Sequence, residues 1–161
     1  MMDTSQKFIK MCEKATEIQK EWDPTVGDYV WRKYTIFGEE IDRKIWPKKE
    51  QSEEIIILHY KSSVNGYFHA VDSTTGQVRI FNSQKEIEKI TCIFLPRQDQ
   101  LQEMIDWSGF SYIVSMQCYK IDAFYRTLNY FPDSMEQLWL AFVMHKKHGK
   151  RWDGEKWIKE G

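Results

Sequence analysis

The sequence predicts an α+β fold: a small, strongly bent antiparallel β-sheet or barrel over about residues 26–95, flanked by an N-terminal helix and a C-terminal helical layer with a short terminal hairpin. Apolar residues recur at steps of three and four before residue 23 and after residue 96, as on one face of a helix. Between these stretches, β-branched and aromatic residues gather in short runs typical of strands. A length of 161 residues suits one domain or two very small ones, and we expect a single domain over residues 1–161.

The first segment, residues 4–22, is predicted to form one helix. A polar residue within Asp3–Ser5 can cap its first turn. Asp23 precedes Pro24 and therefore avoids the helical region, which ends the helix. Its apolar residues form a single stripe that docks the helix on the rest of the protein: Phe8, Met11, Cys12, Ala15, Ile18 and Trp22.

Five runs within residues 26–95 predict strands. They are Tyr29–Ile36, Ile55–Tyr60, Tyr67–Val71, Val78–Phe81 and Ile90–Phe94. Asn65-Gly66 and the stretch Asp72–Gly76 carry the residues that close tight turns between strands. The charged segment Gly38–Glu54 predicts a long, partly extended connection between the first two strands, and its role is open.

Residues 96–148 predict three helices. Pro96 suits the first turn of a short helix, and a longer one follows it. Ser134 and Gln137 fit a capping box for the third, and Gly149 is placed to end it. The longer helix carries a stripe that we expect to face the core: Trp107, Phe110, Val114, Cys118, Ile121, Tyr125 and Leu128.

Residues 151–157 predict a terminal hairpin, because Asp153-Gly154 is a two-residue turn signal between two short arms. Trp152 and Trp157 can pin this ribbon to the protein. A terminal hairpin can also leave one face of each ring exposed, so both tryptophans are candidate binding residues.

Charge and composition exclude several classes of protein. The formal net charge of -1 offers no electrostatic case for a dedicated nucleic-acid binder. The start of the chain lacks the apolar run of a secretory signal, and no apolar run approaches the length of a membrane span, so no membrane partner is expected. The odd, widely spaced set of Cys12, Cys92 and Cys118 favours buried, reduced thiols and a cytoplasmic setting.

Histidines supply two candidate reactive sites, and neither is complete. His145 and His148 share one face of a predicted helix, as a metal pair requires, but no third ligand lies at a matching offset. His59 and His69 lie on neighbouring predicted strands with Asp72 close by, yet no motif supplies the other roles of a catalytic site. The glycine-rich phosphate-binding motifs are absent. We therefore expect no catalytic residue, no metal and no cofactor.

Two basic clusters leave alternatives open. Basic and aromatic residues mix on the first two strands, as in barrels that bind single-stranded nucleic acid: Arg32, Lys33, Tyr34, Tyr60 and Lys61. Basic and acidic residues are equally numerous between positions 24 and 100, however, so this region has no excess positive charge. The run Lys146, Lys147, Lys150 and Arg151 suits the negative end of a helix dipole, or contact with an acidic partner.

Three stretches together resemble a known family: Trp22–Asp28 (WDPTVGD), Leu95–Met104 (LPRQDQLQEM), and Ala141–Met144 (AFVM) running on to Trp152–Trp157 (WDGEKW). They are similar to a family of small uncharacterised proteins encoded by phages and prophages of Gram-positive bacteria. The similarity covers most of the chain from Trp22 onward. The family offers no established activity or catalytic residues to transfer. The resemblance implies a phage genome expressed in the cytoplasm of a bacterial host.

Within the LPRQDQLQEM string, four polar residues open the short helix: Arg97, Gln98, Asp99 and Gln100. Free backbone N–H groups at such a position can bind an anion, which makes these residues candidate binding residues. The alternative is that Asp99 complements the positive end of the helix and the glutamines face water.

From these observations we expect a non-enzymatic binding protein that contacts a host or phage protein, with a host defence system as one such target. One alternative is a nucleic-acid-associated accessory protein that uses the barrel face, and another is a small enzyme with a noncanonical site. A continuous positive stripe over Arg32, Lys33 and Lys61 would favour the first alternative. A deep pocket holding His59 or His69 beside a carboxylate would favour the second.

Overall fold

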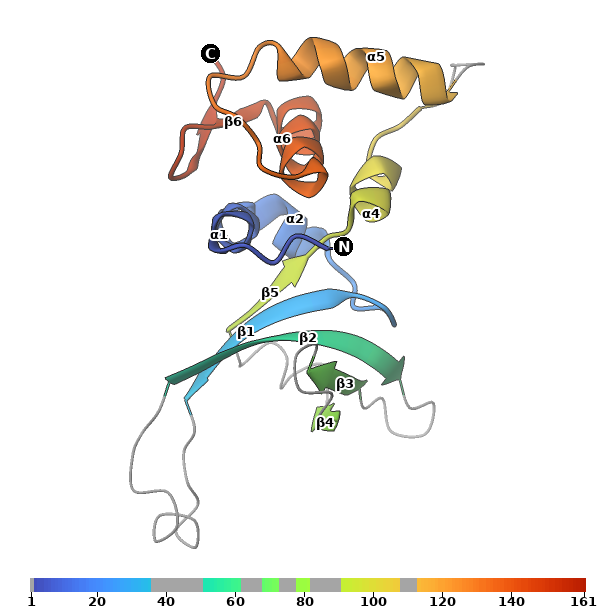
Figure 1. Ribbon diagram of the computed structural model, residues 1–161, viewed down its shortest axis with the longest axis vertical. Helices are drawn as coiled ribbons and strands as arrows, with labels where there is room; N and C mark the ends of the chain where they lie inside the picture. Colours follow the sequence, from blue (N-terminus) through green and yellow to red (C-terminus); the bar gives the residue numbers. More distant parts are fainter. Residues whose placement is uncertain (1, 36–50, 62–67, 73–77, 82–90, 108–112) are drawn as a thin grey trace, which may run out of the picture. The chain divides into compact units, whose positions relative to one another are not determined.

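A computed structural model describes residues 2–35, 51–61, 68–72, 78–81, 91–107 and 113–161 (Figure 1). The chain forms two compact units. A helical unit combines Met1–Trp22 with Pro96–Gly161, and a sheet unit is formed by Asp23–Leu95. The α+β class is therefore confirmed, and the two units are described in turn.

The sheet unit contains five antiparallel strands in the order β4-β3-β2-β1-β5. Their bounds are β1 Tyr29–Thr35, β2 Gln51–Lys61, β3 Phe68–Asp72, β4 Val78–Phe81 and β5 Thr91–Leu95. All five predicted strands are confirmed. The described strands form an open sheet with β4 and β5 at its edges, so the barrel that the sequence left as an option does not form from them. β1 and β2 run as long, curved ribbons (Figure 1).

The register of β1 with β2 corrects the predicted connection between them. Thr35 pairs with Gln51, so β2 begins inside the segment that the sequence assigned to a long connection, Gly38–Glu54. Residues 38–50 of that segment lie outside the described residues, as do the predicted turn Asn65-Gly66 and residues 73–76 of the predicted turn Asp72–Gly76. The β2–β3 register shifts between Leu58 and Tyr60, which is the irregularity of a β-bulge.

A tight turn precedes β1. The Asp28 backbone N–H donates to the Thr25 carbonyl oxygen at 3.2 Å, and the Thr25 N–H donates to the Asp28 carboxylate at 2.8 Å. Gly27 has φ 95° at the third position of this turn, where a type II turn requires positive φ. Gly27 and Asp28 of the WDPTVGD stretch therefore have a structural role, because the turn that they form sets the direction in which β1 starts.

The N-terminal segment forms two helices, α1 Gln6–Lys14 and α2 Thr16–Glu21, so the prediction of one helix over residues 4–22 is wrong. Ala15 leaves the helical region with ψ 65° while its N–H still donates to the Met11 and Cys12 carbonyls at 3.1 Å. The Gln19 side chain donates to the Cys12 carbonyl at 3.1 Å and satisfies it beyond the break. The apolar stripe from Phe8 to Ile18 is nevertheless buried as predicted.

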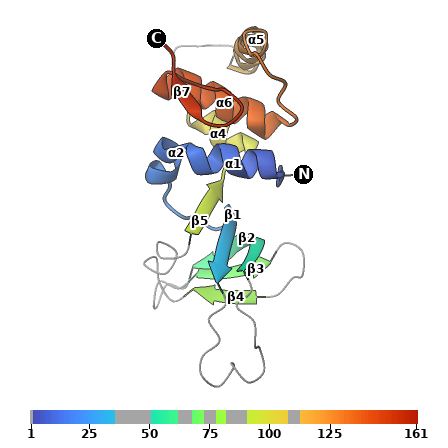
Figure 2. The same cartoon turned by 90° about the vertical axis from the view of Figure 1, so that its left-hand side faces the viewer.

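Three helices follow in the C-terminal part of the helical unit, as predicted: α4 Gln98–Glu103, α5 Ile113–Tyr125 and α6 Met135–His148. In both views α6 lies between the α1–α2 layer and α5 (Figures 1 and 2). It is buried along most of its length, from Trp139 to Met144. The Ser134 hydroxyl accepts from the Gln137 N–H at 3.1 Å, and Gly149 ends the helix in the left-handed region, as the sequence indicates.

The predicted core stripe of α5 is correct only in part. Ile121 is buried as predicted, but Cys118 and Tyr125 are exposed, and Phe124, which lies outside the stripe, is buried. Phe124 packs edge-on against Phe142 of α6 at 5.3 Å between ring centroids.

A partly buried polar network joins the starts of α1 and α6. The Asp3 carboxylate accepts hydrogen bonds from the Ser134 hydroxyl, from the Gln137 amide at 2.8 Å and from the Ser5 backbone N–H at 2.8 Å. Gln137 is fully buried, and its amide oxygen accepts from the Asp133 N–H at 3.1 Å. Burial alone would raise the pKa of the Asp3 carboxyl, but these hydrogen bonds outweigh it and lower that pKa.

The chain ends in the hairpin formed by β6 Lys150–Trp152 and β7 Trp157–Lys159. Trp152 pairs with Trp157, so the connection has four residues rather than the predicted two. The Asp153 carboxylate accepts from the Glu155 and Lys156 N–H groups and holds the loop, while Gly154 has φ 107°. The Trp157 indole donates to the Met11 carbonyl at 3.0 Å, which fastens the hairpin to α1.

Candidate functional site

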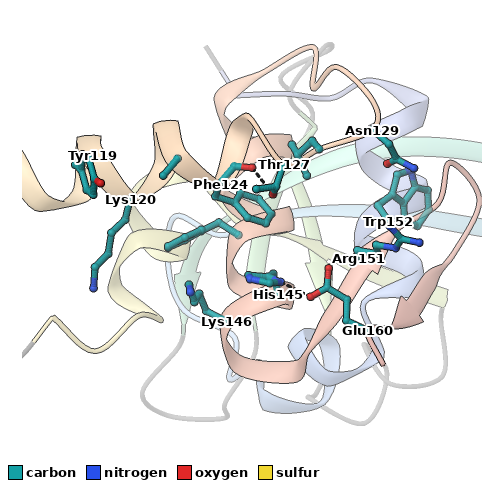
Figure 3. Close-up of a pocket in the computed structure, with 13 residues that line it drawn as sticks. Tyr119, Lys120, Phe124, Thr127, Asn129, His145, Lys146, Arg151, Trp152 and Glu160 are labelled. Carbon is teal, nitrogen blue, oxygen red and sulfur yellow. Dashed lines mark hydrogen bonds and ion pairs between the residues drawn. The ribbon is translucent and has the colours of Figure 1, made fainter.

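A cavity of about 440 Å³ lies in the helical unit between α5, the end of α6 and the terminal hairpin (Figure 3). This volume is in the range of small-molecule sites in proteins. The residues that line it come from all three elements and their connections: Tyr119, Lys120, Ala123, Phe124, Thr127, Leu128, Asn129, Phe142, His145, Lys146, Arg151, Trp152 and Glu160.

A histidine–carboxylate pair lies at the centre of this lining (Figure 3). His145 Nδ1 is 2.6 Å from Glu160 Oε2. The backbone explains the pairing, because Gly149 ends α6 and the hairpin returns the chain until the Glu160 N–H donates to the Gly149 carbonyl at 2.8 Å. The imidazole also packs on Phe124, with 5.1 Å between ring centroids.

Three cationic residues line the same cavity: Lys120, Lys146 and Arg151. Lys146 Nζ lies 5.9 Å from the centre of the Phe142 ring, and Lys120 Nζ lies 5.8 Å from that of Trp107. Within the part of the chain that the structure describes, neither Lys146 nor Arg151 forms an ion pair. With Glu160 as the one acidic lining residue, the cavity has a net positive charge.

Aromatic rings supply the apolar part of the lining. Phe142 and Trp152 are buried, and Phe124 links them to His145 through its contacts with Phe142 and the imidazole. Tyr119 is 70% exposed, so its ring is accessible at the rim. The cavity therefore combines buried aromatic rings in its wall with positively charged residues.

A second hollow, an apolar groove of about 500 Å³, uses another face of α5. It is lined by Ile121, Asp122, Tyr125, Pro132, Asp133, Ser134, Met135 and Leu138. Tyr125, Phe131 and Met135 are exposed beside it, and the Tyr125 and Phe131 rings are 6.5 Å apart. We call these three residues the apolar patch.

The polar residues Arg97–Gln100 lie at the start of α4, as expected, but the helix supplies its own partners there. The Arg97 N–H donates to the Gln100 side chain at 2.9 Å. The Arg97 guanidinium donates to both oxygens of Asp99, which lowers the pKa of that carboxyl. The interpretation in which Asp99 complements the helix dipole therefore has the better support, and Gln98 is half-buried beside it.

The expectation that Trp152 and Trp157 each expose a ring face is wrong. They are 1% and 8% exposed, and their rings contact each other at 5.1 Å. The indole of Trp157 is also bonded to Met11. Both rings are therefore part of the core that holds the hairpin on the helices.

In the sheet unit, the strand register shows which residues lie opposite the candidate nucleic-acid-binding residues. Arg32 pairs with Glu54 and Lys33 with Glu53, while Tyr34 pairs with Ser52. Each of these two basic positions therefore has an acidic residue directly across the ladder. Tyr60 pairs with His69 and Lys61 with Phe68 on β3.

The remaining candidates are placed as follows. His59 falls at the β2 bulge, and Asp72 pairs with Ile56, at the far end of the ladder from His69. Cys12 is buried, which raises the pKa of its thiol, whereas Cys118 is exposed, contrary to the sequence-based expectation. Among the described residues, no three His, Cys, Asp or Glu side chains lie together as a metal-binding group. The carboxylate that lies beside His145 is that of Glu160.

No known family model, curated protein or solved structure matches this chain. None of the helices within the described ranges has the length and apolar character needed to cross a membrane. Fold and site together define an α+β protein whose helical unit carries a cationic, aromatic cavity and, separately, an exposed apolar patch.

Proposed function

We propose that this protein is a non-enzymatic binding protein that acts by contacting another protein. The observation that supports this most directly is the apolar patch beside the groove of the helical unit. Phe131 is 79% exposed, Met135 46% and Tyr125 39%, although each is a large apolar or aromatic side chain. Contiguous exposed apolar surface of this kind marks interaction sites, because covering it releases ordered water.

The charges around the patch favour an apolar contact. Asp133 pairs with Lys7 at 2.8 Å, and Asp122 pairs with Arg126 at 2.9 Å. Both carboxylates at the groove are thus neutralised within the protein. The fitting partner is a protein that inserts an apolar side chain into the groove and covers the Phe131 ring, rather than a strongly charged one.

The resemblance to phage and prophage proteins supports a setting for this contact. The partner is then a host or phage protein in the cytoplasm of the bacterial host, and a component of a host defence system is one such target. The nucleic-acid alternative has weaker support, because Glu53 and Glu54 lie opposite Lys33 and Arg32 in the sheet.

A matched pair of variants tests the proposal. Tagged protein is used to capture partners from the bacterial host, and a recovered partner is then purified and titrated against the protein by calorimetry. We expect saturable one-to-one binding that Phe131→Ser weakens by about 2 kcal/mol or more, roughly thirtyfold. Val26→Ser, at another exposed apolar residue, should leave the affinity unchanged.

Thermal unfolding of both variants checks that the fold is intact. Equal affinities for the wild type and Phe131→Ser would contradict the patch as the contact surface. Tight binding of single-stranded DNA at physiological salt, with no protein partner recovered, would instead favour the nucleic-acid alternative.

A further inference from the structure

We propose that the apolar patch of the free protein contacts a second copy of this chain, so that the Phe131 ring of each copy enters the groove of the other. This inference rests on the proposed function for the surface that is used. It adds a form of regulation, because the partner of that function must displace the second copy. The contact needs only the helical unit.

The Phe131 ring is held in its exposed position before any contact forms. The Lys7 ammonium donates to the Phe131 carbonyl oxygen at 3.1 Å and to the Asp133 carboxylate at 2.8 Å. It therefore bonds the loop on both sides of Pro132, whose own φ is fixed by its ring. The Asp133 N–H also donates to the Gln137 side chain at 3.1 Å. A large ring that is 79% exposed on a fixed backbone loses little conformational entropy when it binds.

The same surface carries both an exposed ring and a hollow that can receive one. The groove beside Phe131 has a volume of about 500 Å³, which is enough for a benzyl group. Its apolar walls come from α5 and α6, through Ile121, Tyr125, Met135 and Leu138. A contact about a two-fold axis uses the same patch on both copies. A second copy therefore meets both requirements of the fitting partner, since it inserts an apolar side chain into the groove and covers the Phe131 ring.

The charges allow two copies of this surface to meet. Four charged groups lie at the groove or its edge, and they form two ion pairs within one copy, Lys7 with Asp133 and Arg126 with Asp122. These groups add no net charge that would repel a second copy. The formal net charge of the whole chain is only -1, so long-range repulsion between copies is also weak.

Sedimentation equilibrium of the full-length protein from about 10 µM to about 500 µM tests this proposal. We expect the mean mass to rise from 19.4 kDa toward twice that value, with a dissociation constant of about 100 µM, as suits a small and transient interface. Phe131→Ser should weaken dimerisation roughly thirtyfold or more, because each dimer loses both inserted rings.

Two further variants test the groove and the fixed loop separately. Met135→Glu places a charge in the wall of the groove, while a carboxylate in the first turn of α6 complements the helix dipole and suits the fold. It should weaken dimerisation about tenfold. Lys7→Met keeps the stem of the side chain but removes both bonds to the loop, and it should weaken dimerisation about fivefold.

Matched controls should leave dimerisation unchanged. They are Lys10→Met, which removes an exposed lysine one turn further along α1, and Val26→Ser, at an exposed apolar residue of the sheet unit. Equal weakening by control and patch variants would overturn the inference, as would a mass that rises beyond that of a dimer, because a two-fold contact closes on itself.

The outcome also separates this inference from the proposed function. A mass of 19.4 kDa at every concentration would overturn the inference, while capture of a host or phage protein would still support the proposed function. Dimerisation that Phe131→Ser abolishes, with no other protein captured from the host, would support the inference and contradict the proposed function.

Discussion

The two units of this protein are built from contacts of different range along the chain. In the sheet unit, β1, β2 and β3 each pair with the next strand along the chain, and β5 returns to pair with β1. In the helical unit, the decisive contacts join the two ends of the chain. Trp157 bonds to Met11, Lys7 pairs with Asp133, and Asp3 accepts from Gln137.

The two units are therefore held together by different kinds of contact. Strands that follow one another in the sequence lie close along the chain, so the entropic cost of pairing them is smaller than for segments at opposite ends of the chain. The helical unit must instead bring residues more than 120 positions apart into register, so it depends on specific side chains that only fit one partner. We therefore expect single substitutions at these side chains to have large effects on stability, and the predictions below take them in order of expected size.

The largest effect is expected for Trp157→Ala. The change removes a buried indole, its contact with Trp152 and its hydrogen bond to Met11, which should cost about 3–5 kcal/mol of unfolding free energy. Urea denaturation measures the loss. Trp157→Phe retains much of the volume and should cost clearly less.

Hydrogen exchange with peptide resolution, measured on Trp157→Ala, tests whether the two units lose stability together. The single-domain prediction from the sequence requires amides of both units to lose the same free energy, because one cooperative transition exposes all of them. A loss confined to residues 1–22 and 96–161 would show that the helical unit unfolds on its own and would contradict the single-domain prediction.

The sequence predicted local features of the fold well and long-range ones poorly. All five strands follow from runs of β-branched and aromatic residues, because that pattern is a property of each segment alone. No glycine or proline marks the break at Ala15 in the sequence, and the Cys12 carbonyl accepts there from both the Ala15 N–H and the Gln19 side chain. The stripe of α5 was predicted only in part: Ile121 is buried, but Tyr125 is exposed and Phe124 is buried in its place.

The candidate site shows the same limit. His145, Lys146 and Arg151 were each recognisable as candidates, since charged residues at a helix end stand out in the sequence. Glu160 was missed as the partner of His145, because the pair is created by the hairpin that returns the chain to Gly149. A glycine helix stop followed by a short hairpin is the signal that could have indicated it.

A smaller effect is expected at the polar network that joins α1 to α6. Asp3→Asn keeps the shape of the side chain but places an amide beside the Ser134 and Gln137 donors. Loss of charge-assisted hydrogen bonds at a partly buried site should cost about 1.5–3 kcal/mol. The variant should also change the pH dependence of stability.

The direction of that pH dependence follows from the lowered pKa of Asp3. A carboxyl whose pKa is lower in the folded than in the unfolded state stabilises the fold above its ordinary pKa of 3.8, and this contribution is lost as pH falls through the folded value. Stability of the wild type should therefore fall steeply below about pH 4, and that of Asp3→Asn less steeply. The free energy of unfolding of both proteins is measured by urea denaturation between pH 2.5 and 7. Parallel curves of this free energy against pH would show that the Asp3 carboxyl does not have the lowered pKa that its hydrogen bonds predict.

The smallest effect compares two exposed Asp–Arg pairs within the helical unit. Asp99 lies in the first turn of α4, where its charge complements the positive end of the helix dipole, and it pairs with Arg97 at 3.0 Å. Asp122 pairs with Arg126 at 2.9 Å but lies in the last turns of α5, where a negative charge meets the negative end of the dipole. Because Asp99 is largely exposed and screened by solvent, Asp99→Asn should cost only about 0.5 kcal/mol, seen as a drop in Tm at low ionic strength. Asp122→Asn should cost less, and 1 M salt should remove most of the difference between the two variants. If Asp122→Asn proved the more destabilising, the position of a carboxylate on its helix would count for less in this unit than the ion pair it forms.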